Sequence, residues 1–159
     1  MQHKVLDTSG ILRTSLDFSD SVYYITNSVL QELQDENARI AIESAIKSGS
    51  VVVRDPSIEF LKRVKRAAEK TGDIGKLSET DIDIIALALE RNLIIVTDDY
   101  GIQNVASLLG LSYETVSQEG IGMRVKWIMF CKACNSEYST NKEFCDICGS
   151  ELRRKSSGI

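Results

Sequence analysis

The sequence predicts an α/β fold, in which a parallel sheet is sandwiched by helices, followed by a small separate module. Three observations predict it. Over the first 120 residues, short apolar runs alternate with segments of helical periodicity, which is the pattern of βαβ units. Residues 93–96 are apolar at every position, as in a parallel strand whose sheet is covered on both faces. All four cysteines lie beyond residue 130 and belong to the separate module.

The first half of the chain contains three predicted strands and one interrupted helix. The strands are short apolar runs that end near polar or turn-forming residues, at residues 4–8, 22–25 and 51–53. Polar residues 26–28 can cap a helix, and apolar residues recur at helical spacing from Val29 until Gly49 stops the run. Residues 35–37 predict a break inside this helix.

The second half supplies the remaining helices and strands. Pro56 stands where a helix over residues 57–71 would begin, because proline suits the first turn of a helix. Ser78 opens a capping signal for a strongly apolar helix over residues 79–91. The elements that follow are the strand 93–96, a helix over 100–109 and a possible edge strand over 113–116.

Length and charge divide the chain into two unequal parts. Its 159 residues suffice for one compact domain and a small module, but not for two full-sized domains. Hydrophobic residues make up 43% and charged residues 26%, which excludes a disordered or membrane-embedded chain. Residues 1–120 carry 12 Lys and Arg against 19 Asp and Glu, whereas residues 121–159 carry 7 against 4. The acidic part needs cations and the basic part suits phosphates. The predicted boundaries are an α/β domain at 1–120, a linker at 121–127, a cysteine module at 128–152 and a basic tail at 153–159.

The sequence predicts no membrane segment. The longest apolar run, residues 84–89, is far shorter than the roughly 20 residues that a spanning helix needs. The first seven residues lack the apolar core of a signal peptide. We therefore expect a cytoplasmic protein in a reducing compartment, where cysteines seldom form disulfides.

Acidic residues recur at the carboxyl ends of the predicted strands, where open parallel sheets bind their ligands. They come from four separate segments and are Asp7, Glu32, Asp81, Asp98 and Asp99. Carboxylates that gather at one rim repel one another unless a cation lies between them, and their hard oxygen atoms select Mg²⁺ or Mn²⁺. One or two such ions can activate water for attack on a phosphodiester.

Each of these acids also has a structural explanation. Helix capping can account for Asp7, Asp81 and Asp98, and a turn can account for Asp99. Glu32 can be a solvated helix residue, although it adjoins Leu33 at the edge of a buried face. Their joint position at the ends of the strands favours a shared cation-binding site over separate structural roles.

The order and spacing of these acids resemble those of the PIN-domain nucleases over residues 3–117. The resemblance is carried by Leu6-Asp7-Thr8-Ser9, Val29-x-x-Glu32-Leu33, Asp81 ahead of Ile84-Ile85-Ala86-x-Ala88, and Val96-Thr97-Asp98-Asp99. It implies that three or four acids bind Mg²⁺ or Mn²⁺ and hydrolyse single-stranded RNA. The matching acids are Asp7, Glu32, Asp81 and one of the pair Asp98 and Asp99, of which the spacing from Thr97 favours Asp99. Ser9 and Thr97 match the hydroxyls that steady such a site.

The cysteines form two Cys-x-x-Cys pairs, Cys131 with Cys134 and Cys145 with Cys148. Thiolates paired on tight turns supply the tetrahedral coordination of a structural zinc ion, and Gly149 suits the second turn. Two disulfides would need an oxidising compartment, and two pairs together disfavour a redox site. Because the module is too small to bury much core, we expect one zinc ion to contribute on the order of 10 kcal/mol to its folding.

Basic and aromatic side chains near the cysteines can bind RNA through phosphate contacts and stacking. They are Arg124, Lys126, Trp127, Lys132, Lys142, Arg153, Arg154 and Lys155. Alternatively, Trp127 and Phe130 pack between the two parts of the chain while the terminal basic residues form a solvated tail. Both roles can hold at once.

A PIN-like domain followed by a zinc ribbon, with residues 97–105 reading TDDYGIQNV, resembles the NIN-one-binding family of ribosome-maturation endonucleases. The resemblance implies cleavage of precursor small-subunit ribosomal RNA at the 3′ end of the 16S-like species, inside the pre-ribosomal small subunit. The chain lacks the insertions of the eukaryotic members and matches the archaeal type. We expect water activated by divalent ions to leave a 3′-hydroxyl and a 5′-phosphate.

Two other functions fit parts of the sequence. A toxin-type PIN ribonuclease would act on transfer RNA or messenger RNA, but such proteins usually end after the α/β domain. A catalytically silent module would bind RNA or protein through its zinc ribbon while the acids only cap helices. Mn²⁺-dependent cleavage would exclude the silent module.

Overall fold

The computed structural model describes residues 2–13, 18–117, 120–139 and 142–158, with only the backbone described at 13, 117, 120–127 and 156–158. The strands are β1 (Gln2–Leu6), β2 (Ser21–Ile25), β3 (Val51–Val53), β4 (Ile94–Val96), β5 (Tyr113–Ser117), β6 (Gly120–Phe130), β7 (Glu137–Tyr138) and β8 (Arg153–Gly158). The helices are α1 (Thr8–Arg13), α2 (Asn27–Glu32), α3 (Glu36–Ser48), α4 (Ile58–Thr71), α5 (Glu79–Arg91) and α6 (Tyr100–Leu109).

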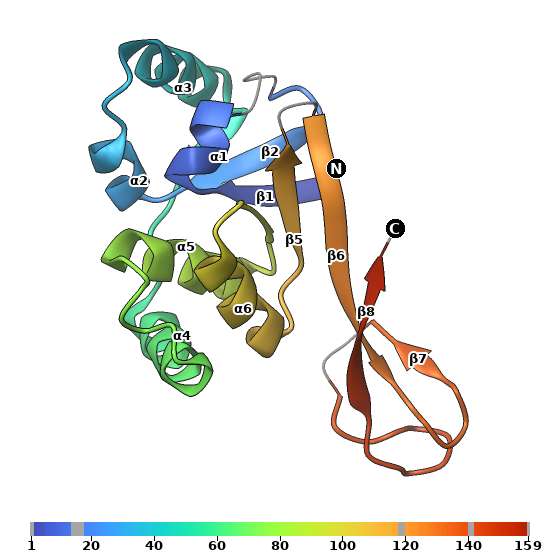
Figure 1. The fold of residues 1–159 in the computed structure, drawn as a ribbon. Coiled ribbons are helices and arrows are strands. Elements are labelled where there is room, and N and C mark those ends of the chain that lie inside the picture. The colour runs from blue at the N-terminus through green and yellow to red at the C-terminus, as the bar shows by residue number, and fades with distance from the viewer. Residues whose placement is uncertain (1, 14–17, 118–119, 140–141, 159) are drawn as a thin grey trace.

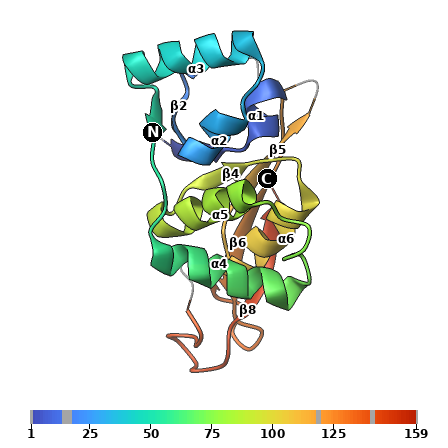
Figure 2. The same cartoon turned by 90° about the vertical axis from the view of Figure 1, so that its left-hand side faces the viewer.

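Five parallel strands form the main sheet, in the order β3-β2-β1-β4-β5. Helices α1–α3 lie on one side of these strands and α4–α6 on the other (Figures 1 and 2). This confirms the predicted parallel sheet sandwiched by helices. Leu6 pairs with Val96 at the ends of the neighbouring strands β1 and β4, so the next residues, Asp7 and Thr97, emerge side by side.

Capping residues determine where the helices begin and end. The side chains of Asp35, Ser78 and Asp99 accept hydrogen bonds from backbone N–H groups in the first turns of α3, α5 and α6. Gly49 ends α3 in the left-handed conformation, with φ of 80°. Helix α2 ends at Glu32 and α3 begins at Glu36, which confirms the predicted break.

The core of the α/β domain is built around α5. Its residues Ile84 to Ala88 are all completely buried. Because α5 is enclosed on most sides, as its apolar sequence predicts, its first turn is a rigid position for Asp81.

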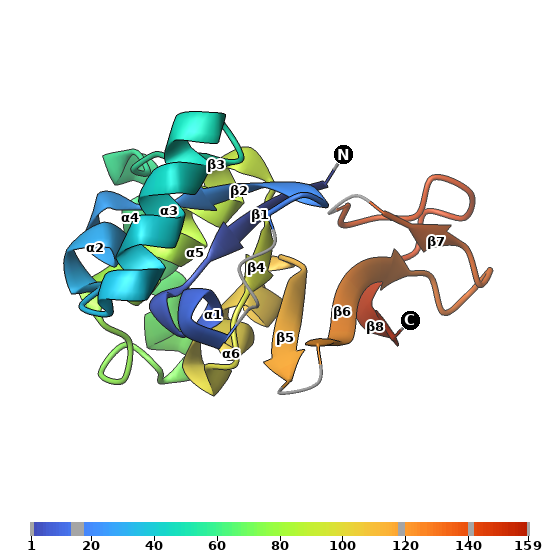
Figure 3. The same cartoon turned by 90° about the horizontal axis from the view of Figure 1, so that it is seen from above.

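Strand β6 runs along β5 and continues into the cysteine module (Figures 1 and 3). It also pairs antiparallel with β7 and β8. Residues 121–127, predicted as a linker, therefore belong to a strand, and residues 153–158 of the predicted tail form β8. The position of the domain boundary itself stays a prediction. In the described part of the chain, no helix is long and apolar enough to span a bilayer.

Candidate active site and metal centre

Asp7 lies at the carboxyl end of β1 and is almost completely buried, with 4% exposure. The Ser9 hydroxyl donates to its carboxylate, with 2.9 Å to each oxygen, and the Thr97 hydroxyl donates to Oδ2 at 2.5 Å. The backbone N–H of Gly10 donates to Oδ1. Both hydroxyls predicted to steady the site thus contact Asp7.

The environment of Asp7 opposes its ionisation even though donors surround it. Burial raises the pKa of Asp7 above the ordinary value of 3.8, and the negative charge of Asp81 adds to the rise. The hydrogen bonds from Thr97, Gly10 and Ser9 act in the opposite direction without cancelling the effect of burial. A nearby cation would favour the ionised form.

Asp81 occupies the first turn of α5, where it belongs to a capping box. Its Oδ2 accepts a hydrogen bond from the Ser78 N–H at 2.7 Å, and the Ser78 hydroxyl accepts one from the Asp81 N–H at 3.1 Å. Burial raises the pKa of Asp81, and the charges of Asp99 and Glu32 raise it further. Asp81 therefore has both the capping role expected from the sequence and an electrostatic interaction with the other acids.

Glu32 is the last residue of α2 and is held by two threonine hydroxyls. Thr80 donates to Oε1 at 2.5 Å and Thr8 donates to Oε2 at 3.1 Å. Neither threonine was predicted to belong to the site. Their positions directly beside Asp81 and Asp7 are the signal that could have found them.

The adjacent residues Asp98 and Asp99 have different surroundings. Oδ1 of Asp98 accepts a hydrogen bond from the Val116 N–H of β5 at 2.6 Å. Asp99 caps α6, since its Oδ1 accepts from the Ile102 N–H at 3.0 Å, and its charge acts on Asp81. The charge of Asp99 therefore acts directly on another acid of the site.

Taken together, Asp81 interacts electrostatically with Asp7, Glu32 and Asp99, which come from three other segments of the chain. Capping occupies one carboxylate oxygen of Asp81 and one of Asp99. Among the described residues, the carboxylate oxygens of these acids are not gathered as closely as the ligands of a bound ion would be. Carboxylates are nevertheless the ligands that hard divalent cations prefer, and such a cation would favour their ionised form, so the four acids are candidate ligands. Such an arrangement can support hydrolysis of a phosphodiester.

The four cysteines form the second candidate centre. Among the described residues they are the one group of His, Cys, Asp and Glu side chains gathered closely enough to hold an ion, with all Sγ atoms within 4.8 Å of one another. The Sγ atoms of Cys131 and Cys148 lie 3.4 Å apart and those of Cys134 and Cys145 lie 3.5 Å apart. A tetrahedral zinc ion with Zn–S bonds of about 2.3 Å needs sulfur atoms about 3.8 Å apart. The cysteines fit zinc.

Two similar turns position these sulfur atoms. Gly149 follows the second cysteine pair with φ of 70°, as predicted, and Asn135 follows the first with φ of 59°. The N–H groups of these residues donate to the carbonyls of Cys145 and Cys131, each at 2.9 Å. Asn135 was not singled out in the sequence, although asparagine tolerates the left-handed conformation better than most residues.

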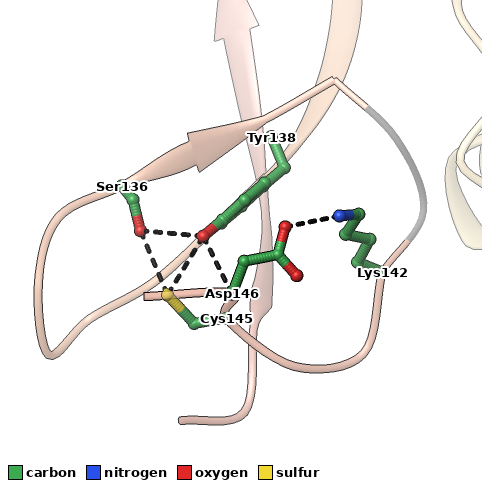
Figure 4. A network of polar contacts seen from close by, with 5 residues as sticks. All are labelled: Ser136, Tyr138, Lys142, Cys145 and Asp146. Carbon is green, nitrogen blue, oxygen red and sulfur yellow. Dashed lines mark hydrogen bonds and ion pairs between the residues drawn. The ribbon is translucent and has the colours of Figure 1, made fainter. Parts of the chain in front are cut away.

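Hydroxyl groups beside Cys145 favour its ionised form. The Ser136 and Tyr138 hydroxyls lie 3.2 Å and 3.1 Å from the Sγ of Cys145 (Figure 4). They lower the pKa of Cys145 to about 5, with Ser136 having the larger effect. A lowered pKa favours the thiolate of Cys145, which is the form that binds zinc.

The basic residues predicted to bind RNA have diverse contacts. Lys142 forms an ion pair with Asp146 at 2.5 Å, and Lys155 lies 3.4 Å from Glu137 (Figure 4 shows the first pair). Arg154 donates to the Ser107 carbonyl in the last turn of α6. Lys132 and Arg153 are exposed. The side chains of Arg124, Lys126 and Trp127 lie outside the described part of the chain, so their RNA-binding role stays a prediction.

Comparison with known proteins identifies the family. A model of the PIN domain of ribonuclease matches residues 5–90. Endoribonuclease Nob1 of Pyrococcus abyssi is 40% identical over 151 residues, which cover 94% of this chain and 91% of that protein. Ribonuclease VapC1 of Thermoplasma acidophilum is 38% identical over 150 residues, covering 94% of this chain and 76% of that protein. The 20S-pre-rRNA D-site endonuclease nob1 of Schizosaccharomyces pombe is 40% identical over 90 residues, covering 55% of this chain and 23% of that protein.

The family match spans more than half of the chain and contains Asp7, Glu32 and Asp81. The similarity to the Pyrococcus protein extends through the cysteine module as well. The chain therefore belongs to the PIN-domain ribonucleases, and within them to the archaeal Nob1 endoribonucleases.

Proposed function

We propose that this endoribonuclease cleaves precursor small-subunit ribosomal RNA at the 3′ end of the 16S-like species during ribosome maturation in the cytoplasm. The observation that carries the proposal is the electrostatic interaction of Asp81 with Asp7, Glu32 and Asp99, because a cation offsets the repulsion among ionised carboxylates held in this way. A similar protein whose name specifies a pre-rRNA cleavage site supports the substrate class.

In this proposal, Asp7, Glu32, Asp81 and Asp99 hold one or two Mg²⁺ or Mn²⁺ ions. A bound ion of this kind activates water and stabilises charge on the leaving oxygen of a phosphodiester. Ser9 and Thr97 keep the Asp7 carboxylate in place through the hydrogen bonds described above. Thr8 and Thr80 do the same for Glu32.

Asp99 is the proposed fourth acid, and Asp98 has a structural role between β4 and β5. The contact of Asp98 with the Val116 N–H and the effect of the Asp99 charge on Asp81 support this assignment. It predicts that Asp99→Asn lowers cleavage strongly. Asp98→Asn is the matched control, because its amide oxygen can still accept the hydrogen bond from Val116, and it should retain most of the activity.

The cysteine module would hold one structural zinc ion through Cys131, Cys134, Cys145 and Cys148. Its exposed basic residues Lys132 and Arg153 support a role in positioning RNA on the α/β domain. The pre-ribosomal small subunit is the proposed site of action.

The proposal is tested with purified protein, Mn²⁺ and an RNA that spans the 3′ end of the 16S-like species. Asp7→Asn and Asp81→Asn should each abolish cleavage while RNA binding persists, and unchanged cleavage by both variants would refute the acidic site. A transfer RNA serves as the second substrate. Equal cleavage of the two RNAs would instead favour a toxin-type ribonuclease, which the similarity to the protein named VapC1 keeps as the second candidate.

A further inference from the structure

The aromatic ring of Tyr100 is a feature of the acidic site that charge does not explain. Tyr100 is the first residue of α6 and directly follows Asp99, the N-cap of that helix. Its side chain is 80% exposed. The other Phe and Tyr rings of the α/β domain all pack on its core; they belong to Phe18, Tyr23, Tyr24, Phe60 and Tyr113. Tyr100 therefore carries the one exposed Phe or Tyr ring in the described part of the chain before β6.

The backbone that carries this ring lies next to the acids. Tyr100 follows Asp99 directly, so their Cα atoms are about 3.8 Å apart. Helix α6 is anchored by buried Ile102 and by Gln103, whose side-chain amide donates to the Thr97 carbonyl at 3.2 Å. A rigid helix thus carries the ring. Within the described residues, no hydrogen bond or ring contact holds the side chain of Tyr100.

We propose that Tyr100 stacks on an unpaired nucleobase next to the phosphodiester that lies at the acids. This inference rests on the proposed ribonuclease function. Single-stranded RNA exposes the faces of its bases, and exposed aromatic side chains bind those faces with little dependence on sequence. The exposed side chain beside Tyr100 in the chain is the acid Asp99, and a charged neighbour suits a nucleotide held at the acids better than an apolar protein surface.

The first test compares cleavage kinetics of Tyr100 variants. Tyr100→Ala and Tyr100→Leu should raise KM by roughly 5- to 150-fold, the range for loss of one stacked base, whereas Tyr100→Phe should stay near wild type. The matched control is Ile58→Ala, since Ile58 is also the first residue of a helix and is 70% exposed. Ile58 lies away from the acids. The N–H of its neighbour Ser57 donates to Glu90, and Glu90 is about 13 Å along α5 from Asp81.

The second test identifies the stacked base. Substrates with a single abasic nucleotide at each position around the cleavage site are cleaved by wild type and by Tyr100→Ala. At one position the missing base should slow cleavage by the wild-type enzyme but have little further effect on cleavage by Tyr100→Ala. The reason is that the missing base and the substitution remove the same contact. If every abasic position affects the two enzymes equally, or if Tyr100→Leu has the wild-type KM, the stacking proposal is wrong. Mn²⁺-dependent cleavage that still requires Asp7 would in that case leave the nuclease proposal intact.

Discussion

At the scale of single residues, the acidic site depends on close contacts around Asp7. A Cβ atom added at Gly10 would lie 2.8 Å from Asp7 Oδ1 and 2.9 Å from the Val96 carbonyl oxygen. We expect Gly10→Ala to displace the carboxylate, to lower cleavage strongly and to destabilise the fold by about 1–3 kcal/mol, although alanine usually favours a helix. Gly75→Ala is the control, because its Cβ would meet nothing within 4 Å. Denaturant unfolding and cleavage assays measure both effects, and a Gly10→Ala variant with wild-type values would contradict this view.

The raised pKa values of Asp7 and Asp81 predict how pH and cations affect stability. An acid whose pKa is raised by folding stabilises the folded state at low pH, and this contribution is lost as pH rises from the unfolded pKa through the folded one. Relative to the Asp7→Asn, Asp81→Asn double variant, the zinc-loaded protein without Mg²⁺ or Mn²⁺ should therefore lose stability as pH rises above about 4, because burial raises both values above 3.8. Mn²⁺ should restore stability at neutral pH, as thermal melting will show. An equal effect of Mn²⁺ on the Asp7→Asn, Asp81→Asn double variant would contradict the prediction.

At the scale of secondary-structure elements, a buried ion pair connects β1 to β5 across β4. The ammonium of Lys4 lies 3.1 Å from a carboxylate oxygen of Glu114, and their side chains are 4% and 5% exposed. Lys4→Met should cost about 3–5 kcal/mol, because it leaves a negative charge in the sheet without this ammonium. Lys65→Met, which removes an exposed pair with Glu79, should cost less than about 1 kcal/mol. Denaturant unfolding of both variants tests this, and similar losses would show that burial does not determine the cost.

The elements that the sequence predicts best are those with strong local signals. Helix α5 matches the predicted range 79–91 because Ser78 caps an apolar segment. Helix α6 matches the predicted range 100–109, but its N-cap is Asp99, for which a turn was predicted, and not Asp98. Helix α1 was missed, since it has only six residues and contains Gly10. Strand β8 was missed because Arg153 to Gly158 lacks the β-branched and aromatic residues typical of strands, and its pairing comes from β6. The acids were found from their positions after strands, whereas the threonines that hold Glu32 depend on contacts between distant segments.

At the scale of the whole molecule, the α/β domain and the cysteine module differ in what stabilises them. The buried core of the module consists of Cys131, Cys145 and Leu152, with Met129 and Tyr138 packed against it. Removing zinc with a chelator should therefore unfold the module and leave the α/β domain folded, as NMR spectra of the whole chain would show. Zinc should restore the module and Mn²⁺ should not. Global unfolding on chelation would contradict this division.

The contact of Arg154 with the Ser107 carbonyl connects the two parts through α6. The same helix carries Asp99 at its other end. Helix α6 is therefore a rigid element that contacts Arg154 at one end and carries an acid of the site at the other.

The central claim is that Asp7, Glu32, Asp81 and Asp99 together bind a divalent cation. Anomalous X-ray scattering from crystals of the zinc-loaded protein grown with Mn²⁺ tests it directly, and the zinc peak at the four cysteines serves as an internal control. We predict a manganese peak within about 2.0–2.6 Å of carboxylate oxygens from Asp7 and at least one other of these acids. A clear zinc peak with no manganese peak among these carboxylates would contradict the account.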